Sequence, residues 1–392
     1  MTDIINIYKK YQAQTFPSPS LLHVKSAKGS YIIDYDNKEY LDFVAGVSAC
    51  SIGHCNKHVT TAVQNQINKY SHVMVYGEYI QDPQYKLAKL LADNLPESLS
   101  TTYFTNSGAE AIEGAIKLAK RINKRSEIIY CKDSYHGSTH GALSVMGNEE
   151  YKSNYRPLLP NCNQIIYNNL ESLEKISDKT SAVIVETIQG ASGFIEASQD
   201  FLNHLKKKCI EFNVLIIFDE IQTCFGRTGK LFGFQHTEIV PDILCIAKGM
   251  GGGFPIGAFI SSWENMNKLT HNPKLGHITT FGGHPVGCTA SHATLDYILK
   301  NKIVDSINEK EILFRELLKH KKIKSISGKG LMLSLDLHDN NETVRIVESC
   351  MNDGLLLFYF LFNDASIRIT PPLTITTEDI KKGCKILLKN LD

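Results

Sequence analysis

Four segments of this 392-residue sequence close an apolar run with a polar residue suited to chemistry. Glu186 follows SAVIV, Asp219 follows VLIIF and Lys248 follows ILCIA, while Asn106-Ser107-Gly108 follows TTYFT. In an open parallel sheet, ligands bind just beyond the carboxyl ends of the strands. A single such residue is more often part of a structural ion pair than of a site. Four of them together favour a functional site at one edge of a sheet.

The segment FTNSGAEAIEGAIKLAKR at 104–121 is a candidate phosphate site. Ser107 and Gly108 precede a run of strong helix formers, and the free backbone N–H groups at a helix N-terminus attract phosphate. Taken alone, the segment favours an ordinary N-cap without a ligand over a phosphate site. Two glycine-rich strings, FGRTGKL at 225–231 and KGMGGGFPIG at 248–257, lack the spacings of the ATP and dinucleotide fingerprints.

A lysine beside a phosphate site, with an aspartate at an adjacent strand end, indicates pyridoxal phosphate. The amine of Lys248 is suited to forming a Schiff base with the cofactor aldehyde. The carboxylate of Asp219 is suited to holding the pyridine nitrogen protonated, which makes the ring an electron sink. The glycines after Lys248 predict a tightly turned backbone around this amine.

The elements that must position these residues alternate along the chain. Short apolar runs that predict strands are separated by helix-length connections, which favours a parallel sheet covered on both faces. The predicted strands are EIIYCK (127–132), NQIIY (163–167), SAVIVE (181–186), NVLIIFDE (213–220) and DILCIAKG (242–249). Residues 30–43 predict a hairpin around Asp36-Asn37, and 59–95 has a helical pattern.

The pattern changes near residue 290, where a smaller α+β unit follows the larger α/β one. A helix is expected at about 286–300, and strands are expected in GLMLSLDL (330–337) and ASIRIT (365–370). The sequence contains no internal repeat and no low-complexity linker.

Composition excludes several classes of protein. The formal net charge is +1, with 42 basic and 41 acidic residues, so nucleic acid and anionic membrane surfaces are not expected partners. The ten cysteines contain no CxxC pair, which favours reduced, mostly buried thiols over a disulfide framework or a metal site. No signal segment or membrane span is predicted, and a cytoplasmic protein is expected.

The chain closely resembles the class III pyridoxal-phosphate aminotransferases, through ordered motifs that run along nearly its whole length. These motifs are FTNSGAEAIEGAIKLAKR (104–121), YHG (135–137), ETIQGASG (186–193), FDEIQTCFGRTG (218–229), AKGMGGGFPIGA (247–258), TTFGGHP (279–285) and IRITPPLTI (367–375). The resemblance implies that Lys248 and Asp219 are the catalytic residues, with Lys248 bonded to the cofactor and Asp219 paired with its ring nitrogen.

The resemblance also implies the other cofactor contacts. Gln222 would approach the ring 3-hydroxyl and Tyr135 would stack on the ring, with His136 and Glu186 supporting this shell.

The phosphate and the substrate have their own implied residues. Ser107, Gly108 and Ala109 would hold the phosphate of their own subunit, whereas Thr280 would reach the phosphate of the neighbouring subunit, which implies a homodimer. Arg368 would grip a substrate carboxylate through its bidentate fork.

The implied fold is the fold-type I architecture of pyridoxal-phosphate enzymes, α/β in class. A large domain with a mostly parallel seven-stranded sheet would occupy 51–288, and a smaller α+β domain would comprise 289–392 with help from an N-terminal segment, 1–50.

The motifs that bear on the substrate do not all match one group within this family. Acetylornithine, ornithine and 4-aminobutyrate enzymes typically carry Arg at the position where this chain has Ser138. They often carry Glu at the position of Ala191. His284 stands where the family usually has Asn. The length and the C-terminal motif favour an acetylornithine- or ornithine-like donor, a 2-oxo acid such as 2-oxoglutarate as acceptor, and a place in arginine biosynthesis. An ω-amino acid or amine:pyruvate transaminase is the alternative, because YHGST also occurs in that group. A decarboxylase or aminomutase on the same scaffold would retain the same cofactor residues.

Overall fold

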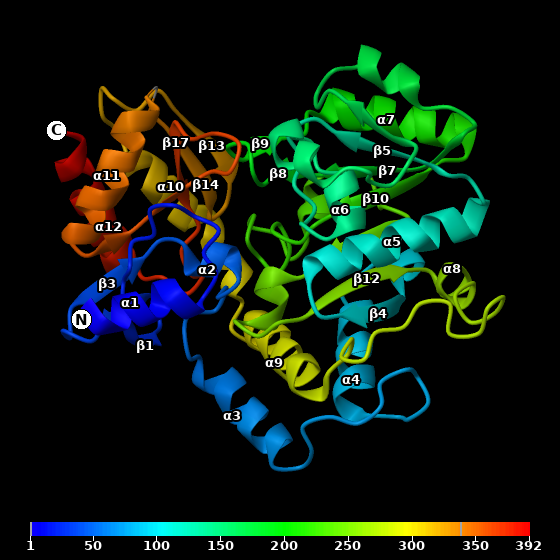
Figure 1. The fold of residues 1–392 in the computed structure, drawn as a ribbon, viewed down its shortest axis with the longest axis horizontal. Coiled ribbons are helices and arrows are strands. Elements are labelled where there is room, and N and C mark those ends of the chain that lie inside the picture. Colours follow the sequence, from blue (N-terminus) through cyan, green and yellow to red (C-terminus); the bar gives the residue numbers. More distant parts are fainter. Residues whose placement is uncertain (1, 338) are drawn as a thin grey trace.

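The computed structural model describes residues 2–337 and 339–392, and its larger part is built on a seven-stranded sheet (Figure 1). The strands lie in the order β4-β12-β11-β10-β7-β5-β6. Their bounds are β4 (Thr101–Thr105), β5 (Glu127–Cys131), β6 (Cys162–Ile165), β7 (Thr180–Glu186), β10 (Leu215–Asp219), β11 (Ile243–Ile246) and β12 (Gly257–Ser261). Each strand run predicted from the apolar pattern is present.

The sheet is mixed rather than wholly parallel. Strand β12 runs antiparallel to both of its neighbours, β11 and β4, while the other adjacent strands are parallel. Only residues 247–256 join β11 to β12. A parallel connection needs a crossover of a dozen or more residues, so this short loop returns the chain in the opposite direction.

Both faces of the sheet are buried, as its apolar strands predict. Ile217 packs in the cluster that contains α5 (Gly108–Asn123), whereas the next residue, Phe218, packs in the cluster that contains Phe201 of α7 (Gln199–Phe212). Successive strand side chains point to opposite faces, so one strand supplies both cores. Smaller helices lie beside the sheet at α6 (His140–Ser144) and α8 (Trp263–Asn267). A two-stranded ribbon is formed by β8 (Ile188–Gln189) and β9 (Ile195–Glu196).

The helical pattern at 59–95 proves to be two helices, α3 (Lys57–Ile67) and α4 (Asp82–Ala92). Residues 68–81 between them form neither helix nor strand. Pro83 stands in the first turn of α4, where a proline is tolerated, but it could not continue a helix arriving from α3. Gly77 lies at φ +85°, which also interrupts helical geometry. Apolar residues within 68–81 continue the spacing of a helix, so the sequence pattern ran past the ends of both helices.

The smaller part of the molecule combines both ends of the chain. One sheet has the order β1-β2-β3-β15 and a second has the order β13-β14-β17-β16. The strands are β1 (Val24–Lys28), β2 (Tyr31–Asp34), β3 (Glu39–Asp42), β13 (Ser325–Lys329), β14 (Met332–Asp336), β15 (Leu355–Leu356), β16 (Phe358–Tyr359) and β17 (Ser366–Ile369). The helices are α1 (Thr2–Tyr11), α2 (Ala45–Ser48), α10 (Ile307–Leu317), α11 (Asn340–Asn352) and α12 (Thr377–Leu391). The expected hairpin is present, with Asn37 at φ 63° in its turn.

The link between the two parts is α9 (Pro285–Lys300), close to the predicted helix. Its residues Cys288, Leu295 and Ile298 belong to the core of the large part. That core therefore extends past residue 288, where the sequence placed a boundary, because α9 packs against α3 and α4.

All ten cysteines are unpaired and seven are buried, as the sequence predicted. Within the described residues, no helix combines the length and apolar character that a membrane crossing requires.

Candidate active site

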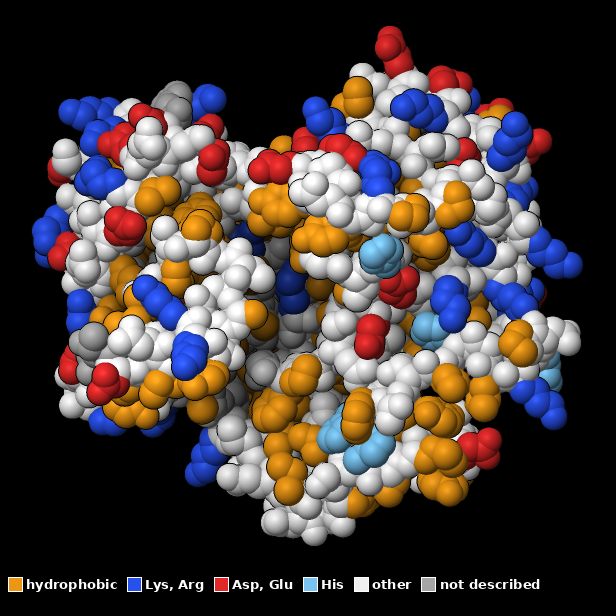
Figure 2. Space-filling view, viewed as in Figure 1, with side chains coloured by type: hydrophobic (Ala, Val, Ile, Leu, Met, Phe, Trp, Pro, Cys, Tyr) orange, Lys and Arg blue, Asp and Glu red, His pale blue; other side chains and the backbone are white. Residues whose placement is uncertain are grey.

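The predicted site residues other than Thr280 meet between the two parts of the molecule, where the surface is hollowed (Figure 2). A cavity of about 810 Å³ is lined by Glu186, Asp219, Lys248 and Arg368 among others. A second cavity of about 460 Å³ shares Lys248 and contains Ser107 and the N-terminus of α5. The carboxyl ends of β4, β7, β10 and β11 thus converge, as expected for an open α/β sheet.

Lys248 lies two residues after the end of β11, near the start of the loop to β12. Its backbone has φ 45°, an uncommon value for a residue with a side chain. Burial lowers the pKa of its amine, although the charge of Asp219 opposes that shift; the charge of Arg368 adds to it. An amine with a lowered pKa is more readily neutral, and a neutral amine is the nucleophilic and basic form.

Asp219 ends β10 and is held from two sides. Its Oδ2 lies 2.6 Å from Nδ1 of His136, and its Oδ1 accepts a hydrogen bond of 2.9 Å from the backbone N–H of Ile221. Burial alone would favour a neutral imidazole, but the hydrogen bond and charge of Asp219 outweigh it and raise the pKa of His136. The pair fixes the direction in which the carboxylate faces the cavity. His136 therefore touches Asp219 directly, a contact that the sequence did not predict.

The N-terminus of α5 faces the smaller cavity. Ser107 is the N-cap, and its Oγ accepts a hydrogen bond from the backbone N–H of Glu110. Gly108 lies against Ile221, where an added Cβ would stand 2.7 Å from Cδ1 of that residue. Gly257 on β12 lies so close that an added Cβ would stand 2.4 Å from the backbone oxygen of Ser107. These glycines let the helix start pack closely against Ile221 and β12, and its first residues, 107–109, line the smaller cavity.

Tyr135 lines both cavities, and Glu186 lines the larger one. The backbone N–H groups of Tyr135 and Gly190 each donate to the carboxylate of Glu186, at 3.1 and 2.6 Å. Burial raises the pKa of Glu186 to about 7. The Tyr135 hydroxyl lies 3.2 Å from Oγ of Ser138, which is exposed. Glu186 thus ties the loop that carries Tyr135 to the segment after β7.

Arg368 on β17 approaches from the small part of the molecule. It is 6% exposed, and its guanidinium lies over the rings of Phe194 and Phe360, at 5.5 and 4.8 Å from their centroids. Nη2 donates to the Gly190 carbonyl at 3.4 Å, and Nε has no hydrogen-bond partner in the described structure. Burial lowers its pKa to about 10.

Gln222 lines the larger cavity, whereas Thr280 lies outside both cavities. The amide of Gln222 donates to Oγ of Ser48 at 3.1 Å. Thr280 is exposed and lines neither of the two cavities that contain Lys248.

Several residues of the site were missed by sequence reasoning. Phe194, Phe360 and Ser48 contact predicted site residues but come from segments far from them in the chain. The aromatic run LLFYFLF at 356–362 was the available signal, since such a run on a short, partly exposed segment is suited to lining a pocket.

Comparisons with known proteins agree with this geometry. The model of the family described as aminotransferase class-III matches residues 12–391. The chain is 38% identical to an acetylornithine aminotransferase of Caldanaerobacter subterraneus subsp. tengcongensis, over 98% of both proteins. The chain belongs to the class III aminotransferases. An acetylornithine aminotransferase of Archaeoglobus fulgidus is 36% identical over 98% of this chain and 100% of its own.

Solved structures of class III relatives have the same fold. An ornithine aminotransferase from Toxoplasma gondii superimposes with a TM-score of 0.92 at 28% identity, covering 99% of this chain and 94% of the other. An adenosylmethionine-8-amino-7-oxononanoate aminotransferase of Methanocaldococcus jannaschii gives 0.91 at 27%, covering 100% and 99%. The chain is therefore a pyridoxal-phosphate-dependent transaminase of fold type I.

The residues of the site fit this cofactor. The first turn of α5, which lines the smaller cavity, is suited to a phosphate, and the buried carboxylate of Asp219 is suited to a protonated ring nitrogen. Lys248 lines both cavities and so stands between the phosphate position at α5 and the carboxylate of Asp219.

Proposed function

We propose that this aminotransferase takes an amino group from an acetylornithine- or ornithine-like donor and transfers it to a 2-oxo acid such as 2-oxoglutarate. Arg368 carries the proposal, because a buried guanidinium with a partnerless Nε lines the same cavity as Lys248. A carboxylate is the group that such a fork binds best. The names of the relatives, acetylornithine and ornithine aminotransferases, support the choice of donor. They also support a place in arginine biosynthesis.

The chain's own residues divide the work of the reaction. When bound, pyridoxal phosphate supplies an electron sink for the carbon that loses its proton. Nζ of Lys248, with its lowered pKa, would take that proton from the substrate carbon and deliver it to the cofactor, so that the donor amine becomes a carbonyl on hydrolysis. Asp219 holds a proton on the ring nitrogen, and His136 keeps its carboxylate in place.

The other contacts to the cofactor are proposed from where each residue lies around the two cavities. The backbone of Ser107, Gly108 and Ala109 binds the phosphate, and Gln222 meets the ring hydroxyl. Tyr135 stacks on the ring from the loop that Glu186 anchors.

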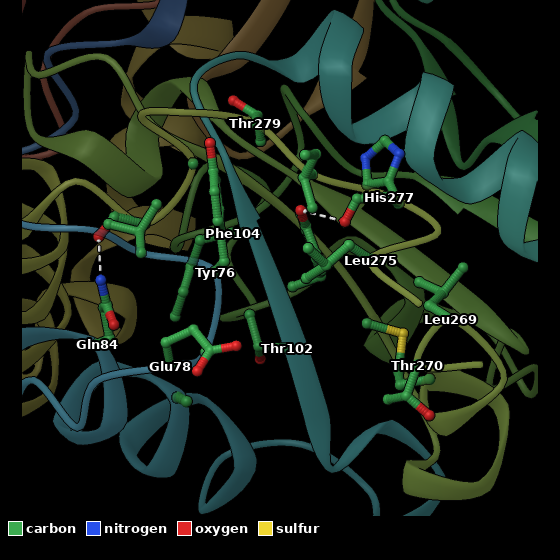
Figure 3. Close-up of a pocket in the computed structure, with 18 of the residues that line it drawn as sticks. Tyr76, Glu78, Gln84, Thr102, Phe104, Leu269, Thr270, Leu275, His277 and Thr279 are labelled. Carbon is green, nitrogen blue, oxygen red and sulfur yellow. Dashed lines mark hydrogen bonds between the residues drawn. The ribbon is translucent and has the colours of Figure 1, made fainter. Parts of the chain in front are cut away.

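A homodimer completes the site in this proposal. A cavity of about 780 Å³ lies away from Lys248 and is lined by segments 75–85, 101–104 and 266–283; Figure 3 shows Gln84, Phe104 and His277 around it. The segments around it carry exposed apolar side chains, here called the dimer patch: Tyr79 (57% exposed), Ile80 (94%), Leu275 (50%), Ile278 (47%) and Phe281 (52%). A patch of this kind marks a protein interface. Thr280 is exposed and lies between Ile278 and Phe281 in the chain, which supports its predicted reach into a second copy.

An amine:pyruvate transaminase is the second candidate. Ser138 stands near Tyr135 without a charge, and the cavity has no basic lining residue other than Lys248 and Arg368 among the residues described. An acceptor with one carboxylate, such as pyruvate, needs no second cation.

The cytoplasm is the proposed location. Ten cysteines without a disulfide, seven of them buried, are typical of a reducing compartment.

The test begins with Lys248→Ala, for which we expect turnover to fall by at least about 10²–10⁴-fold because the proton-transferring amine is gone. The measurement is the rate with acetylornithine, ornithine and β-alanine as donors, and with 2-oxoglutarate and pyruvate as acceptors. Lys230→Ala, an exposed lysine outside the cavities, is the matched control. Turnover by Lys248→Ala at the parent rate would contradict the role of the lysine. Release of carbon dioxide without an oxo acid would instead identify a decarboxylase.

A further inference from the structure

Arg227, in the loop that follows β10, is a fully buried charged side chain that has no assigned role. It is 1% exposed, and burial lowers the pKa of its guanidinium to about 9. Nη1 donates hydrogen bonds of 2.8 and 2.6 Å to the main-chain carbonyls of Leu331 and Pro371. Nε and Nη2 have no hydrogen-bond partner in the described structure. A buried cation is costly, so this contact between the two parts of the molecule requires an explanation.

The contact closes one end of the strand pair β14–β17, which carries Arg368. Arg368 lies opposite Ser334 in this antiparallel pair, and the same register, continued beyond the strands, sets Leu331 opposite Pro371. Proline has no N–H group, so Pro371 cannot donate a hydrogen bond to the carbonyl of Leu331. Arg227 reaches across from the large part and supplies a donor to both carbonyls.

The main chain of Arg227 holds the same strand end. Its carbonyl accepts a hydrogen bond of 2.9 Å from the backbone N–H of Leu331. Gly330 has φ +63°, and an added Cβ there would stand 2.6 Å from the carbonyl oxygen of Arg227. The loop therefore packs directly on the turn that precedes β14. Side chain and main chain of one residue both attach the small part to the large part.

The other end of this loop is tied to the reacting groups. The loop begins at Asp219, the last residue of β10. Between Asp219 and Arg227, Sγ of Cys224 donates at 3.6 Å to the carbonyl of Ala247, the residue before Lys248. One short buried segment thus contacts the carboxylate, the chain beside the amine and the strands that carry Arg368.

The guanidinium of Arg368 has few hydrogen bonds of its own to fix it. Nη2 donates to the Gly190 carbonyl at a long 3.4 Å, and Nε has no partner in the described structure. The rings of Phe194 and Phe360 limit its tilt but do not direct its N–H groups. The position of β17 therefore decides where this fork lies in the cavity.

We propose that Arg227 is a positioning residue for carboxylate recognition, which fixes the β14–β17 pair and thereby the place of Arg368 relative to Lys248. The proposal rests on the proposed function, in which Arg368 binds a substrate carboxylate. Loss of Arg227 lets the strand end shift, and a small misplacement of a binding group weakens recognition strongly. The amine chemistry at Lys248 is affected less, because that residue stays on the large sheet.

The experiment measures the half-reaction of the holoenzyme, in which the amino compound alone changes the cofactor absorbance. Glutamate and alanine, the amino forms of the two candidate acceptors, are each compared with a molecule that lacks the carboxylate beside the amine, 4-aminobutyrate and ethylamine. We expect Arg227→Met to lower the kcat/KM ratio of amino acid over comparison amine about 10–100-fold. The KM for the amino acid should rise while kcat changes less.

Arg227→Lys keeps the charge but replaces the planar guanidinium with a single ammonium, so a smaller fall in the same direction is expected. This variant carries the comparison if Arg227→Met does not fold. A ratio and a KM equal to those of the parent would overturn the proposal.

A double-mutant cycle with Arg368→Ala separates positioning from a general structural effect. Arg368→Ala should itself lower the ratio, and adding Arg227→Met should then lower it little further, because the group being positioned is gone. Losses that multiply independently in the double variant would contradict the proposal. If Arg368→Ala leaves the ratio unchanged, the carboxylate-binding role in the proposed function fails instead.

Arg125→Met is the matched control. Nη1 of Arg125 also donates to main-chain carbonyls, those of Thr180 and Phe212 at 3.0 and 2.8 Å, but these lie within the large part. We expect this variant to lower the melting temperature without changing the ratio. An equal fall of the ratio in Arg125→Met and Arg227→Met would show that only stability matters, and would also overturn the proposal.

Discussion

The contact between His136 and Asp219 joins two buried side chains, 1% and 5% exposed, at 2.6 Å. A buried carboxylate without a partner is costly, so the imidazole both stabilises the charge of Asp219 and fixes its direction. His136 is thus a positioning residue, which acts on the reaction through Asp219. Nε2 of His136 has no partner in the described structure, so the ring is oriented by Nδ1.

For His136→Ala we expect kcat to fall about 10–100-fold, because loss of the hydrogen bond leaves Oδ2 of Asp219 unsatisfied at a cost of about 1–3 kcal/mol. His136→Asn can restore a donor near the position of Nδ1 and should recover much of the rate. The measurement is kcat and KM for each variant, together with the cofactor absorbance against pH. Equal losses in the two variants, with an unchanged pH profile, would show that the ring matters only for packing.

Among the elements, the N-terminal hairpin is attached to the segment before α3 through His54. The backbones of Gly29 and His54 exchange two hydrogen bonds, of 2.9 and 2.8 Å. Nε2 of His54 lies 2.7 Å from Oδ2 of Asp42, whose other oxygen accepts from the backbone N–H groups of Val44 and Ala45. Asp42 therefore links the end of β3 to the segment that leads from it into the large part.

This ion pair predicts a pH-dependent stability. Burial is the largest influence and opposes a charged imidazole, but the hydrogen bonds and charges of Asp42 and Cys50 together outweigh it and raise the pKa of His54 to about 10. A folded-state pKa above the unfolded value of about 6.5 means that the stabilisation is complete below about pH 6.5 and is lost as the pH rises towards about 10.

We expect His54→Gln to cost about 1–3 kcal/mol of unfolding free energy at about pH 6 and progressively less above it. Urea unfolding of parent and variant across this range measures the difference. His204→Gln, an exposed histidine on α7, is the control. A cost that is constant with pH would contradict the charged pair.

At the scale of the whole molecule, the two parts supply different ends of one site. Lys248 and Asp219 come from the large sheet, whereas Arg368 comes from β17 of the small part. A change in how the parts pack would alter the distance between the reacting amine and the carboxylate-binding arginine. The dimer patch lies on the large part, around segments 75–85 and 266–283.

Ile80→Glu tests the proposed dimer: the Ile80 side chain is 94% exposed in the single chain and would be buried between two copies in that dimer, so a charge there would block association. We expect a monomer by size-exclusion chromatography with light scattering, and loss of activity together with weaker cofactor binding. Ile210→Glu, 72% exposed on α7, is the control and should remain dimeric and active. An active Ile80→Glu monomer would refute the need for a second copy.

The sequence predicted those features that local pattern determines. Strand ends were found because apolar runs stop at polar residues, as at Asp219 and Lys248. The rings around Arg368 were missed because Phe194 and Phe360 meet only through tertiary packing. The break at 68–81 was missed because its apolar side chains imitate a helix. The roles of Thr280 and of the other cofactor contacts stay predictions.

The parallel pairing of β3 with β15 places Leu41 beside Leu355. During synthesis, β3 leaves the ribosome early, yet its partner is made only after the entire large part. The core of the small part is therefore completed last. Until then, the apolar side chains of its N-terminal strands stay exposed while the rest of the chain folds. For this molecule, the period between the first and last strands of one small sheet is the interval of greatest exposure to aggregation and to chaperones.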